Sequence, residues 1–374
     1  MRGHFVDIRE HIREGIKKSA PASVLVAMSG GVDSSVAAAL LVEQGYQVTG
    51  LMLRLWSEGG RCEENRCCTP DSMALARRVA AQLKIPFYAV DAQQLFRDEV
   101  VQYFIEGYKE GITPNPCLTC NRLVRWGFLL DRAIDLGAKF MATGHYARII
   151  NDNNGKIRLL KGVDPTKDQS YVLHFLGQSN LEKTLFPLGG TTKPQVREMA
   201  KTRGLPVAEK PDSQDLCFLG ADDYRKFLQR HAPEVEKPGP IYNADGELIG
   251  EHRGLAFYTI GQRKGLGVAT TEPLYVIFKD RERNALLVGK ADQLGSDNLS
   301  AGNVNWIVGE PPAAPFRSQV KIRYKAQAAW AQVTPIGQDG VLVQFEQPVR
   351  DITPGQAVVF YNDEECLGGG IIQE

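Results

Sequence analysis

The sequence lacks any long hydrophobic run. No stretch of the chain approaches the roughly 18 uninterrupted apolar residues that a membrane-spanning helix requires. The first residues, MRGHFVDIREHIREGIKKS, are polar and mixed in charge, which fits neither a signal peptide nor a membrane anchor. Net charge is absent too, because 44 basic residues balance 44 acidic ones, so the total neither favours nor excludes a nucleic-acid partner. We therefore expect a cytoplasmic protein with no membrane partner.

Two common nucleotide-binding patterns are also missing. No Gly-x-x-x-x-Gly-Lys-Ser/Thr loop occurs, which disfavours the usual transfer of a γ-phosphate, and no Gly-x-Gly-x-x-Gly follows the first expected strand. The seven cysteines are odd in number and unevenly spaced. Without an export signal, cysteines of this kind favour catalytic, redox or metal-binding roles over structural disulfides.

The first half of the chain alternates strand and helix patterns. Buried-strand runs are expected at 22–28, 47–55, 86–90 and 139–144, separated by helical periodicity at 34–43, 71–83, 93–109 and 121–136. Strands separated by helices of this length predict an α/β fold with a doubly wound parallel sheet.

The second half is rich in strand patterns. Residues 147–162 predict a hairpin around an Asn-Gly turn, and short strands with tight turns follow from about residue 238. They predict two small β-rich domains divided near 290–298, the last of them a β-barrel. A length of 374 residues suits such an organisation. We expect domains at 1–220, 221–298 and 299–374.

The strongest motif is Ser-Gly-Gly-Val-Asp-Ser-Ser at 29–35, directly after a strand and opening a helix. Backbone N–H groups and a helix N-terminus at that edge of a sheet bind anions. Ser29, Ser34 and Ser35 add hydroxyl donors, and Asp33 offers oxygen ligands for Mg²⁺. The alternative is a glycine-rich turn in which Asp and Ser only cap the helix. The loop resembles that of the ATP-pyrophosphatase (PP-loop) superfamily, whose members cleave ATP to AMP and pyrophosphate.

Two further segments carry cysteines in loops. Thr-Pro-Asn-Pro-Cys-Leu-Thr-Cys-Asn at 113–121 places Cys120 at the expected start of a helix, where the helix N-terminus favours the nucleophilic thiolate. Asp-Ser-Gln-Asp-Leu-Cys-Phe at 212–218 carries Cys217. Both segments are expected outside regular helix interiors, as mobile catalytic thiols require.

Five motifs in a fixed order now point to one family. They are Ser-Gly-Gly-Val-Asp-Ser, Thr-Pro-Asn-Pro-x-x-x-Cys-Asn, Ala-Thr-Gly-His-Tyr, Lys-Asp-Gln-Ser-Tyr and Asp-Ser-x-x-x-Cys-Phe. Together they resemble the tRNA-specific 2-thiouridylase family over nearly the whole chain. The resemblance implies a PP-loop domain followed by two small β-rich domains, the last a tRNA-binding β-barrel.

The resemblance also implies roles for individual residues. Cys217 is expected to carry the incoming persulfide sulfur, and Cys120 to be the second catalytic cysteine, which forms a disulfide with Cys217 as sulfur is released. The expected ATP contacts are Ala27, Met28, Ser29, Gly30, Gly31, Val32, Asp33, Ser34, Leu53 and Gly144. The expected RNA contacts are Asn115, Pro116, Cys117, His145, Lys167, Asp168, Gln169, Arg323, Tyr324 and Gln356.

The family's reaction implies the cofactors and partners. ATP with Mg²⁺ adenylates the C2 oxygen of the wobble uridine, and a persulfide sulfur replaces that oxygen to give 2-thiouridine. The expected partners are tRNAs for Lys, Glu and Gln, and a persulfide donor such as a cysteine desulfurase or a sulfur-relay protein.

One position departs from the family pattern. Residue 117 is Cys where familiar members carry Asp, so Cys117, Cys120 and Cys217 are candidate ligands for three irons of a 4Fe–4S cluster. The other interpretation is a spare thiol at Cys117, with the persulfide route intact. Cys62, Cys67 and Cys68 lie in a polar loop without a nearby His, which disfavours a metal site. Cys366 is expected to fill space among the last strands.

The RNA surface is expected on the last domain. Residues 311–338 contain no acidic side chain, and Lys321, Arg323 and Lys325 alternate with Val320, Ile322 and Tyr324. In a strand this alternation places the three cations on one face as a phosphate-binding stripe, with Tyr324 available for stacking. Without the family resemblance, a solvated outer strand face explains the pattern equally well.

Two other functions are alternatives to RNA thiolation. An amidoligase or synthetase with the same loop acts on a small carboxylate, but amide formation needs no persulfide-carrying cysteines. A non-catalytic RNA-binding module needs neither an intact nucleotide loop nor the two cysteines. The sequence therefore favours an ATP-dependent tRNA sulfurtransferase.

Overall fold

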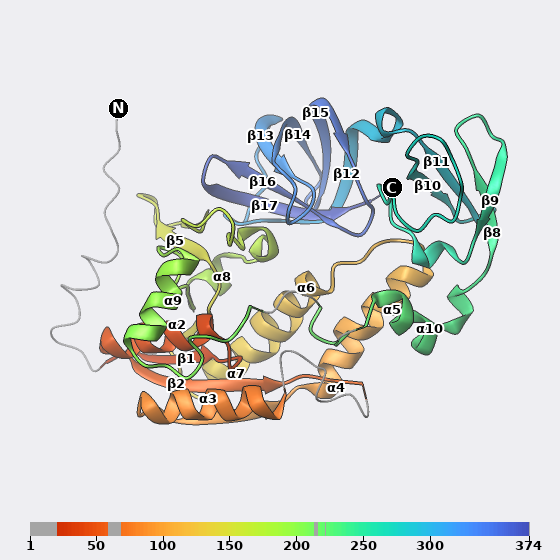
Figure 1. Ribbon diagram of the computed structural model, residues 1–374. Coiled ribbons are helices and arrows are strands. Elements are labelled where there is room, and N and C mark those ends of the chain that lie inside the picture. The colour runs from red at the N-terminus through yellow and green to blue at the C-terminus, as the bar shows by residue number, and fades with distance from the viewer. Residues whose placement is uncertain (1–20, 59–68, 213–215, 221, 374) are drawn as a thin grey trace.

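The computed structural model describes residues 21–58, 69–212, 216–220 and 222–373 (Figure 1). Cys62, Cys67 and Cys68 lie outside these ranges. The first unit holds a five-stranded parallel sheet in the order β3-β2-β1-β4-β7. Its strands are β1 (Ser23–Ala27), β2 (Gln47–Arg54), β3 (Phe87–Asp91), β4 (Phe140–Ala142) and β7 (Thr184–Leu185).

Helices cover both faces of this sheet, which confirms the doubly wound prediction. Val24 and Val26 of β1 pack with α2 (Val32–Glu43), α3 (Pro70–Gln82) and α9 (Lys193–Thr202). Leu25 points to the opposite face and packs with the helical stretch η2 (Cys120–Leu129) and α7 (Leu130–Asp135). Successive strand residues face opposite sides of a sheet, so a continuous apolar run is what a strand buried on both faces needs.

Two helical stretches depart from the expected bounds or geometry. The expected helix at 93–109 comprises α4 (Gln93–Phe96), a π-helical η1 (Arg97–Val101) and α5 (Gln102–Lys109). The helix expected to begin at Asn121 begins earlier, with α6 (Pro116–Thr119), and continues directly into η2. Pro116 occupies the first helical turn, where its fixed φ suits the helix and its missing N–H costs nothing. The remaining short elements are η3 (Ser170–Leu173), α8 (Gln178–Leu181), α10 (Tyr224–His231), η4 (Pro233–Val235), η5 (Leu255–Phe257) and η6 (Ala291–Leu294).

The last strands form a barrel. They are β12 (Gly295–Trp306), β13 (Phe316–Lys321), β14 (Ala329–Ile336), β15 (Gly340–Arg350), β16 (Ala357–Asn362) and β17 (Glu365–Ile372). Their order is β12-β15-β14-β13-β16-β17, and β12 also pairs with β17, so the sheet closes as predicted. The expected hairpin, β5 (Ala147–Asn151) and β6 (Ile157–Lys161), is present, and β6 extends the same sheet by pairing with β17.

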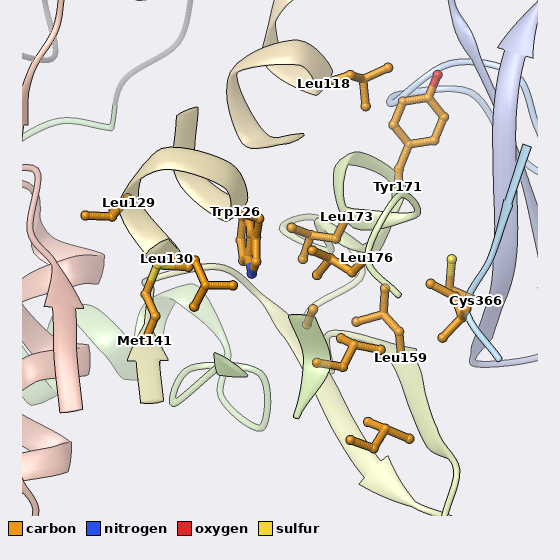
Figure 2. Close-up of a cluster of buried hydrophobic side chains, with 14 of the residues drawn as sticks. Leu118, Trp126, Leu129, Leu130, Met141, Leu159, Tyr171, Leu173, Leu176 and Cys366 are labelled. Atoms are coloured by element: carbon orange, nitrogen blue, oxygen red, sulfur yellow. The ribbon is translucent and has the colours of Figure 1, made fainter. Parts of the chain in front are cut away.

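This pairing gives the first unit and the barrel a shared core. Figure 2 shows Trp126 and Leu130 from the helical stretch, Leu159 from β6 and Cys366 from β17 in one cluster of buried side chains. Cys366 is fully buried, as a space-filling residue should be. Tyr171 strengthens the junction, because its hydroxyl donates a 2.9 Å hydrogen bond to the carbonyl oxygen of Ala357.

A second, smaller sheet lies between the other two parts in sequence. It has the order β10-β11-β8-β9, from β8 (Gly239–Tyr242), β9 (Leu248–His252), β10 (Tyr275–Asp280) and β11 (Ala285–Gly289). β12 begins at Gly295, so the expected domain start at 299 falls inside that strand. No observation tests the domain limits 1–220, 221–298 and 299–374 as a whole, and they stay a proposal. Within the described ranges, no helix has the length and apolar character needed to cross a bilayer.

Candidate active site

The glycine-rich loop lies at the carboxyl end of β1, between β2 and β4. The chain proceeds to one side of β1 through β2 and β3 and then to the other side through β4, so this is the switch point where open α/β sheets bind ligands. Gly30 has φ +67°, and a Cβ on it would lie 2.1 Å from the carbonyl oxygen of Ser72. Only glycine fits there.

The hydroxyl groups of the loop differ in their availability. Ser34 Oγ accepts a 3.1 Å hydrogen bond from the Ser29 amide and lies 3.2 Å from Ser29 Oγ, so these two side chains meet at the loop. Ser35 is fully buried, and its hydroxyl donates to the carbonyl oxygen of Gly31 at 2.8 Å. The expectation that Ser35 offers its hydroxyl to phosphate is therefore wrong, because that hydroxyl donates its hydrogen bond to the backbone of the loop.

The other expected ATP contacts surround the loop in different ways. The side chains of Met28 and Val32 are buried in the apolar core on one face of the sheet. Ala27 ends β1, and Leu53 lies near the end of the neighbouring β2. Gly144 follows β4, and a Cβ on it would lie 2.8 Å from the Ser34 amide nitrogen. The structure thus brings all these residues to one sheet edge, and their contact with ATP remains a prediction.

The Asp33 carboxylate is held by two side chains that sequence reasoning did not assign. Lys193 Nζ lies 2.7 Å from each Asp33 oxygen, and the Tyr146 hydroxyl donates to Asp33 Oδ1 at 2.7 Å. Burial, and then the Asp33 charge, raise the pKa of Tyr146, so its hydroxyl stays a donor. Tyr146 belongs to the Ala-Thr-Gly-His-Tyr motif, whereas Lys193 stands outside all five motifs.

Three cationic side chains form ion pairs with the carboxylate of Asp212, which precedes Cys217 in the sequence. Lys193 Nζ lies 3.0 Å from Asp212 Oδ1, Arg197 Nη2 lies 2.6 Å from the same oxygen, and Lys167 Nζ lies 2.8 Å from Oδ2. Burial alone would raise the pKa of Asp212, but the hydrogen bonds from Lys167 and Lys193 outweigh it and hold the pKa at about 2. The carboxylate is therefore ionised at neutral pH.

A second chain of contacts leads from the loop towards Cys120. His145 adjoins Tyr146, and its ring bonds Thr143 Oγ1 at 2.8 Å on one side and meets Arg125 Nη1 at 3.3 Å on the other. Arg125 Nη1 also donates to Asn121 Oδ1 at 2.6 Å, next to Cys120. Burial, and then the Arg125 charge, push the pKa of His145 well below its usual value, so the ring is neutral. His145 is thus a buried, hydrogen-bonded residue, and its expected RNA contact stays a prediction.

The three candidate cysteines differ in exposure. Cys117 is exposed, Cys217 is half-buried and Cys120 is buried. Cys120 lies within the continuous helical stretch from Pro116, not at its start, so the expectation that both thiols avoid helix interiors is wrong for Cys120. Cys120 belongs to the apolar cluster around Phe104 and Phe218, and Cys217 packs against the same cluster. Both proposed catalytic thiols therefore border one hydrophobic cluster.

The donor set does not fit an iron–sulfur cluster in this arrangement. Among the described residues, which include Cys117, Cys120 and Cys217, no group of three or more His, Cys, Asp or Glu side chains is placed to hold a metal ion. A 4Fe–4S cluster needs its thiolates gathered around one position. Cys117 instead lies near Tyr324, whose pKa is raised by burial, then by the Asp168 charge and by Cys117.

A cavity of about 410 Å³ joins the segments that carry these cysteines. Asn115 and Pro116 line it from one segment, Leu216 and Leu219 from the other, and Gln356 from the barrel. The Gln356 side chain donates to the carbonyl oxygen of Thr113 at 2.7 Å. A cavity of this size accommodates a small organic ligand such as a nucleoside.

The Lys-Asp-Gln-Ser-Tyr motif has structural partners throughout. Asp168 is buried and accepts hydrogen bonds from the Gly162 and Ser170 amides, both at 3.1 Å. Gln169 Oε1 accepts from the Tyr146 amide at 3.0 Å. Lys167 pairs with Asp212. These contacts brace the Tyr146 and Asp212 segments, while RNA contact by 167–169 remains a prediction.

The basic stripe is not a strand face. β13 ends at Lys321, and the chain turns through residues 322–326, so Lys321, Arg323 and Lys325 do not share one side of a strand. Arg323 Nη2 instead donates to the carbonyl oxygen of Ile260 at 3.1 Å and to Thr353 Oγ1. Arg323 therefore joins the middle part of the chain to a barrel loop. The predicted strand face is wrong, because a turn can carry the same alternation of residues.

Comparison with known proteins identifies the family. Residues 22–221 match the model of the tRNA methyl transferase HUP domain, 225–290 the tRNA methyl transferase PRC-barrel domain, and 296–372 the aminomethyltransferase beta-barrel domain. The tRNA-specific 2-thiouridylase MnmA of Chloroflexus aggregans is 49% identical over 94% of this chain and 98% of its own. That of Roseiflexus castenholzii is 48% identical over 94% and 99%.

A solved structure is also similar, though distantly. It is the U34-tRNA thiolase NcsA from Methanococcus maripaludis with its 4Fe–4S cluster, 19% identical over 61% of this chain and 72% of that chain, with a TM-score of 0.34. A likeness this low carries nothing about the chemistry of the present chain. The two cysteine segments, the loop at the switch point and the near-full-length identity to the curated relatives agree, and the chain belongs to the tRNA-specific 2-thiouridylase family.

Proposed function

We propose that the protein is an ATP-dependent tRNA sulfurtransferase that converts the wobble uridine to 2-thiouridine with Cys217 as the persulfide carrier and Cys120 as the resolving thiol. Family membership supports the coarse part, which is ATP-dependent thiolation of tRNA. The observation that carries the finer part is the position of Asp33. On one side, Lys193 contacts both Asp33 and Asp212, and Asp212 precedes Cys217. On the other side, Tyr146 donates to Asp33 and is preceded in the chain by His145. The His145 ring contacts Arg125, which donates to Asn121 beside Cys120.

The first step is adenylation. The C2 oxygen of the uridine attacks the α-phosphorus of ATP, the N3 proton is lost, and pyrophosphate leaves with the electron pair of the broken P–O bond. The amides and hydroxyls of the loop hold the phosphates, as the N-terminus of α2 favours anions. Asp33 is the expected ligand of the Mg²⁺ that accompanies ATP and neutralises phosphate charge.

The second step transfers sulfur. The terminal sulfur of a Cys217 persulfide adds to C2, and the Cys120 thiolate attacks Cys217 Sγ. The sulfur–sulfur bond of the persulfide breaks, a Cys120–Cys217 disulfide forms, and the sulfur on C2 keeps the electron pair. AMP departs with the former C2 oxygen, and N3 regains a proton. A thiol reductant then restores both cysteines.

The 410 Å³ cavity is the proposed place of the target base. Leu216 adjoins Cys217 and Pro116 adjoins Cys117, so a base there would lie between the two cysteine segments. Gln356 brings the barrel to the same cavity, which supports RNA contact by the barrel. The tRNAs for Lys, Glu and Gln, and a cysteine desulfurase or sulfur-relay protein as the persulfide source, are the proposed partners.

Nucleoside mass spectrometry of tRNA tests this function. The wild type, incubated with tRNA, Mg²⁺, ATP and a persulfide source, should produce 2-thiouridine, and Cys217→Ser and Cys120→Ser should produce none. Cys117→Ser is the matched control, because Cys117 is exposed and the persulfide route does not use it, so it should retain most activity. Loss of thiolation in Cys117→Ser together with bound iron would instead favour the cluster route.

A further inference from the structure

A second and larger cavity lies between the smaller sheet and the barrel. Its volume is about 860 Å³, which is within the range of pockets that hold small organic ligands. Strand β10 lines it from the smaller sheet, and β12 and β15 line it from the barrel. Gly111, Ile112 and Thr113 line it from the loop between α5 and α6. The base cavity shares none of its lining residues, so the two are separate sites.

Lys279 brings a buried positive charge to the wall of this cavity. It is 8% exposed, and its ammonium donates a 3.0 Å hydrogen bond to the carbonyl oxygen of Tyr258. An ammonium carries three N–H donors, so two are left for an acceptor in the cavity. Burial, and then the Arg281 charge, lower its pKa, and no carboxylate of the described residues offsets them. A buried charge is costly unless an anion pairs with it.

The other charges of the cavity wall leave Lys279 as its available cation. The lining that the structure describes contains no Asp and no Glu. Arg281 lines the cavity too, but its guanidinium donates to the carbonyl oxygen of Glu110 and has a further interaction, so it is already engaged. A ligand that pairs with Lys279 alone needs one negative charge.

Acidic side chains close to the lining residues have cations of their own. Asp280 follows Lys279 in β10, and its carboxylate lies 3.8 Å from Arg283. Asp351 adjoins the lining at residue 352, and its charge acts on Arg323. Neither carboxylate therefore neutralises Lys279.

The remaining wall suits the body of an organic anion. Ile260, Ile277 and Ile352 offer apolar surface, and Gln344 and Gln373 add amide groups. Apolar surface gains free energy when a ligand removes it from water. A carboxylate is ionised at neutral pH, carries one negative charge and only accepts hydrogen bonds. These properties match an ammonium that has two donors to offer.

We propose that this cavity binds a small carboxylate, with its head paired to Lys279 and its apolar body against the isoleucine side chains. The site lies outside the nucleotide loop and the base cavity, so it goes beyond the proposed function and does not depend on it. An anion without an apolar body, such as inorganic phosphate, leaves the apolar wall uncovered and should bind much more weakly.

Isothermal titration calorimetry of the full chain with octanoate tests the proposal. At about pH 6.5, Lys279 is mostly charged and octanoate is ionised. The wild type should bind octanoate at one site, and 1-octanol, which has a similar body without the charge, at least about tenfold more weakly. Lys279→Met should lose at least about tenfold in octanoate affinity. Lys264→Met, at an exposed position outside the lining, is the matched control and should keep the wild-type affinity.

Protection of Lys279 from acetylation is a second measurement, and it needs no variant. Octanoate should slow the reaction of Lys279 with an acetyl N-hydroxysuccinimide ester, followed by peptide mass spectrometry, and leave the reaction of Lys264 unchanged. Absence of octanoate binding to the wild type would overturn the proposal. So would wild-type octanoate affinity in Lys279→Met, equal affinity for 1-octanol or inorganic phosphate, or unprotected Lys279 at saturating octanoate.

Discussion

At the scale of single residues, the site depends on close approaches and shared charges. Gly30 and Gly144 let backbone segments approach the nucleotide loop, and the sequence predicted both as ATP contacts. Lys193, Tyr146 and Arg125 escaped prediction, because their roles arise from partners far away in the sequence. A lysine at the start of a helix looks ordinary until Asp33 and Asp212 are placed beside it.

Gly144→Ala should disturb the nucleotide loop directly. The new Cβ would lie 2.8 Å from the Ser34 amide nitrogen and 2.9 Å from the Asp33 carbonyl carbon, so the start of α2 has to shift. We expect a stability loss of about 1–3 kcal/mol and ATP binding weakened about tenfold or more. Gly177→Ala, where a Cβ meets nothing within 4 Å, should do neither. Calorimetric ATP titration and thermal unfolding measure both, and wild-type ATP affinity in Gly144→Ala would remove Gly144 from the site.

Lys279 should give the protein a pH-dependent stability. Its ammonium is buried and donates to the Tyr258 carbonyl oxygen at 3.0 Å. Burial, and then the Arg281 charge, lower the pKa of Lys279 to about 7 from 10.5. Between these pH values the unfolded chain binds more protons than the folded one, so this group's contribution to unfolding free energy rises with pH.

Lys279→Met removes that dependence. Its stability relative to wild type should be greatest below about pH 7 and should decline as the pH rises towards about 10.5. Denaturant unfolding across this range measures the difference, with Lys264→Met, an exposed position, as control. A difference that does not change with pH would show that Lys279 keeps its ordinary pKa in the folded protein.

At the scale of elements, the sequence predicts structures that neighbouring residues form and misses pairings between distant segments. The Asn-Gly turn predicted the β5–β6 hairpin, and the strand–loop–helix pattern predicted β1 and α2 around the loop. Pairing of β6 with β17 joins residues far apart in the sequence, and no local pattern marks it. The same limit explains why the predicted basic strand face at 321–325 is absent. The end of β13 depends on its neighbouring strands in the sheet, and the alternation of residues in the sequence does not mark it.

Leu159→Ala tests the junction between β6 and β17. Leu159 is fully buried in the shared core and lies opposite Cys366 in the register. Its truncation should cost about 2–5 kcal/mol of unfolding free energy, and hydrogen exchange should lose protection in β17 as well as in β6. Leu248→Ala is the control, since Leu248 is 66% exposed. If β17 kept its protection while β6 lost it, the barrel would be stable independently of the hairpin.

At the scale of the whole molecule, the proposed site combines the nucleotide loop with a base cavity that is lined by the cysteine segments and by the barrel. The parallel sheet supplies the nucleotide loop, the segments around Cys120 and Cys217 supply the cavity walls, and the barrel supplies Gln356. Thr113 ties these parts together, because it donates its amide to the Pro354 carbonyl oxygen at 3.1 Å and accepts from Gln356. The central claim is that adenylation and sulfur transfer occur at one site formed by these parts.

A single-turnover reaction tests that claim most directly. Protein loaded with ³⁵S-labelled persulfide at Cys217 is mixed with tRNA, Mg²⁺ and ATP without reductant, and AMP, labelled 2-thiouridine and the Cys120–Cys217 disulfide are quantified over time. The account predicts that all three appear together in equal amounts, with the label at the wobble position. AMP formation without labelled 2-thiouridine, or labelled product without the disulfide, would contradict it.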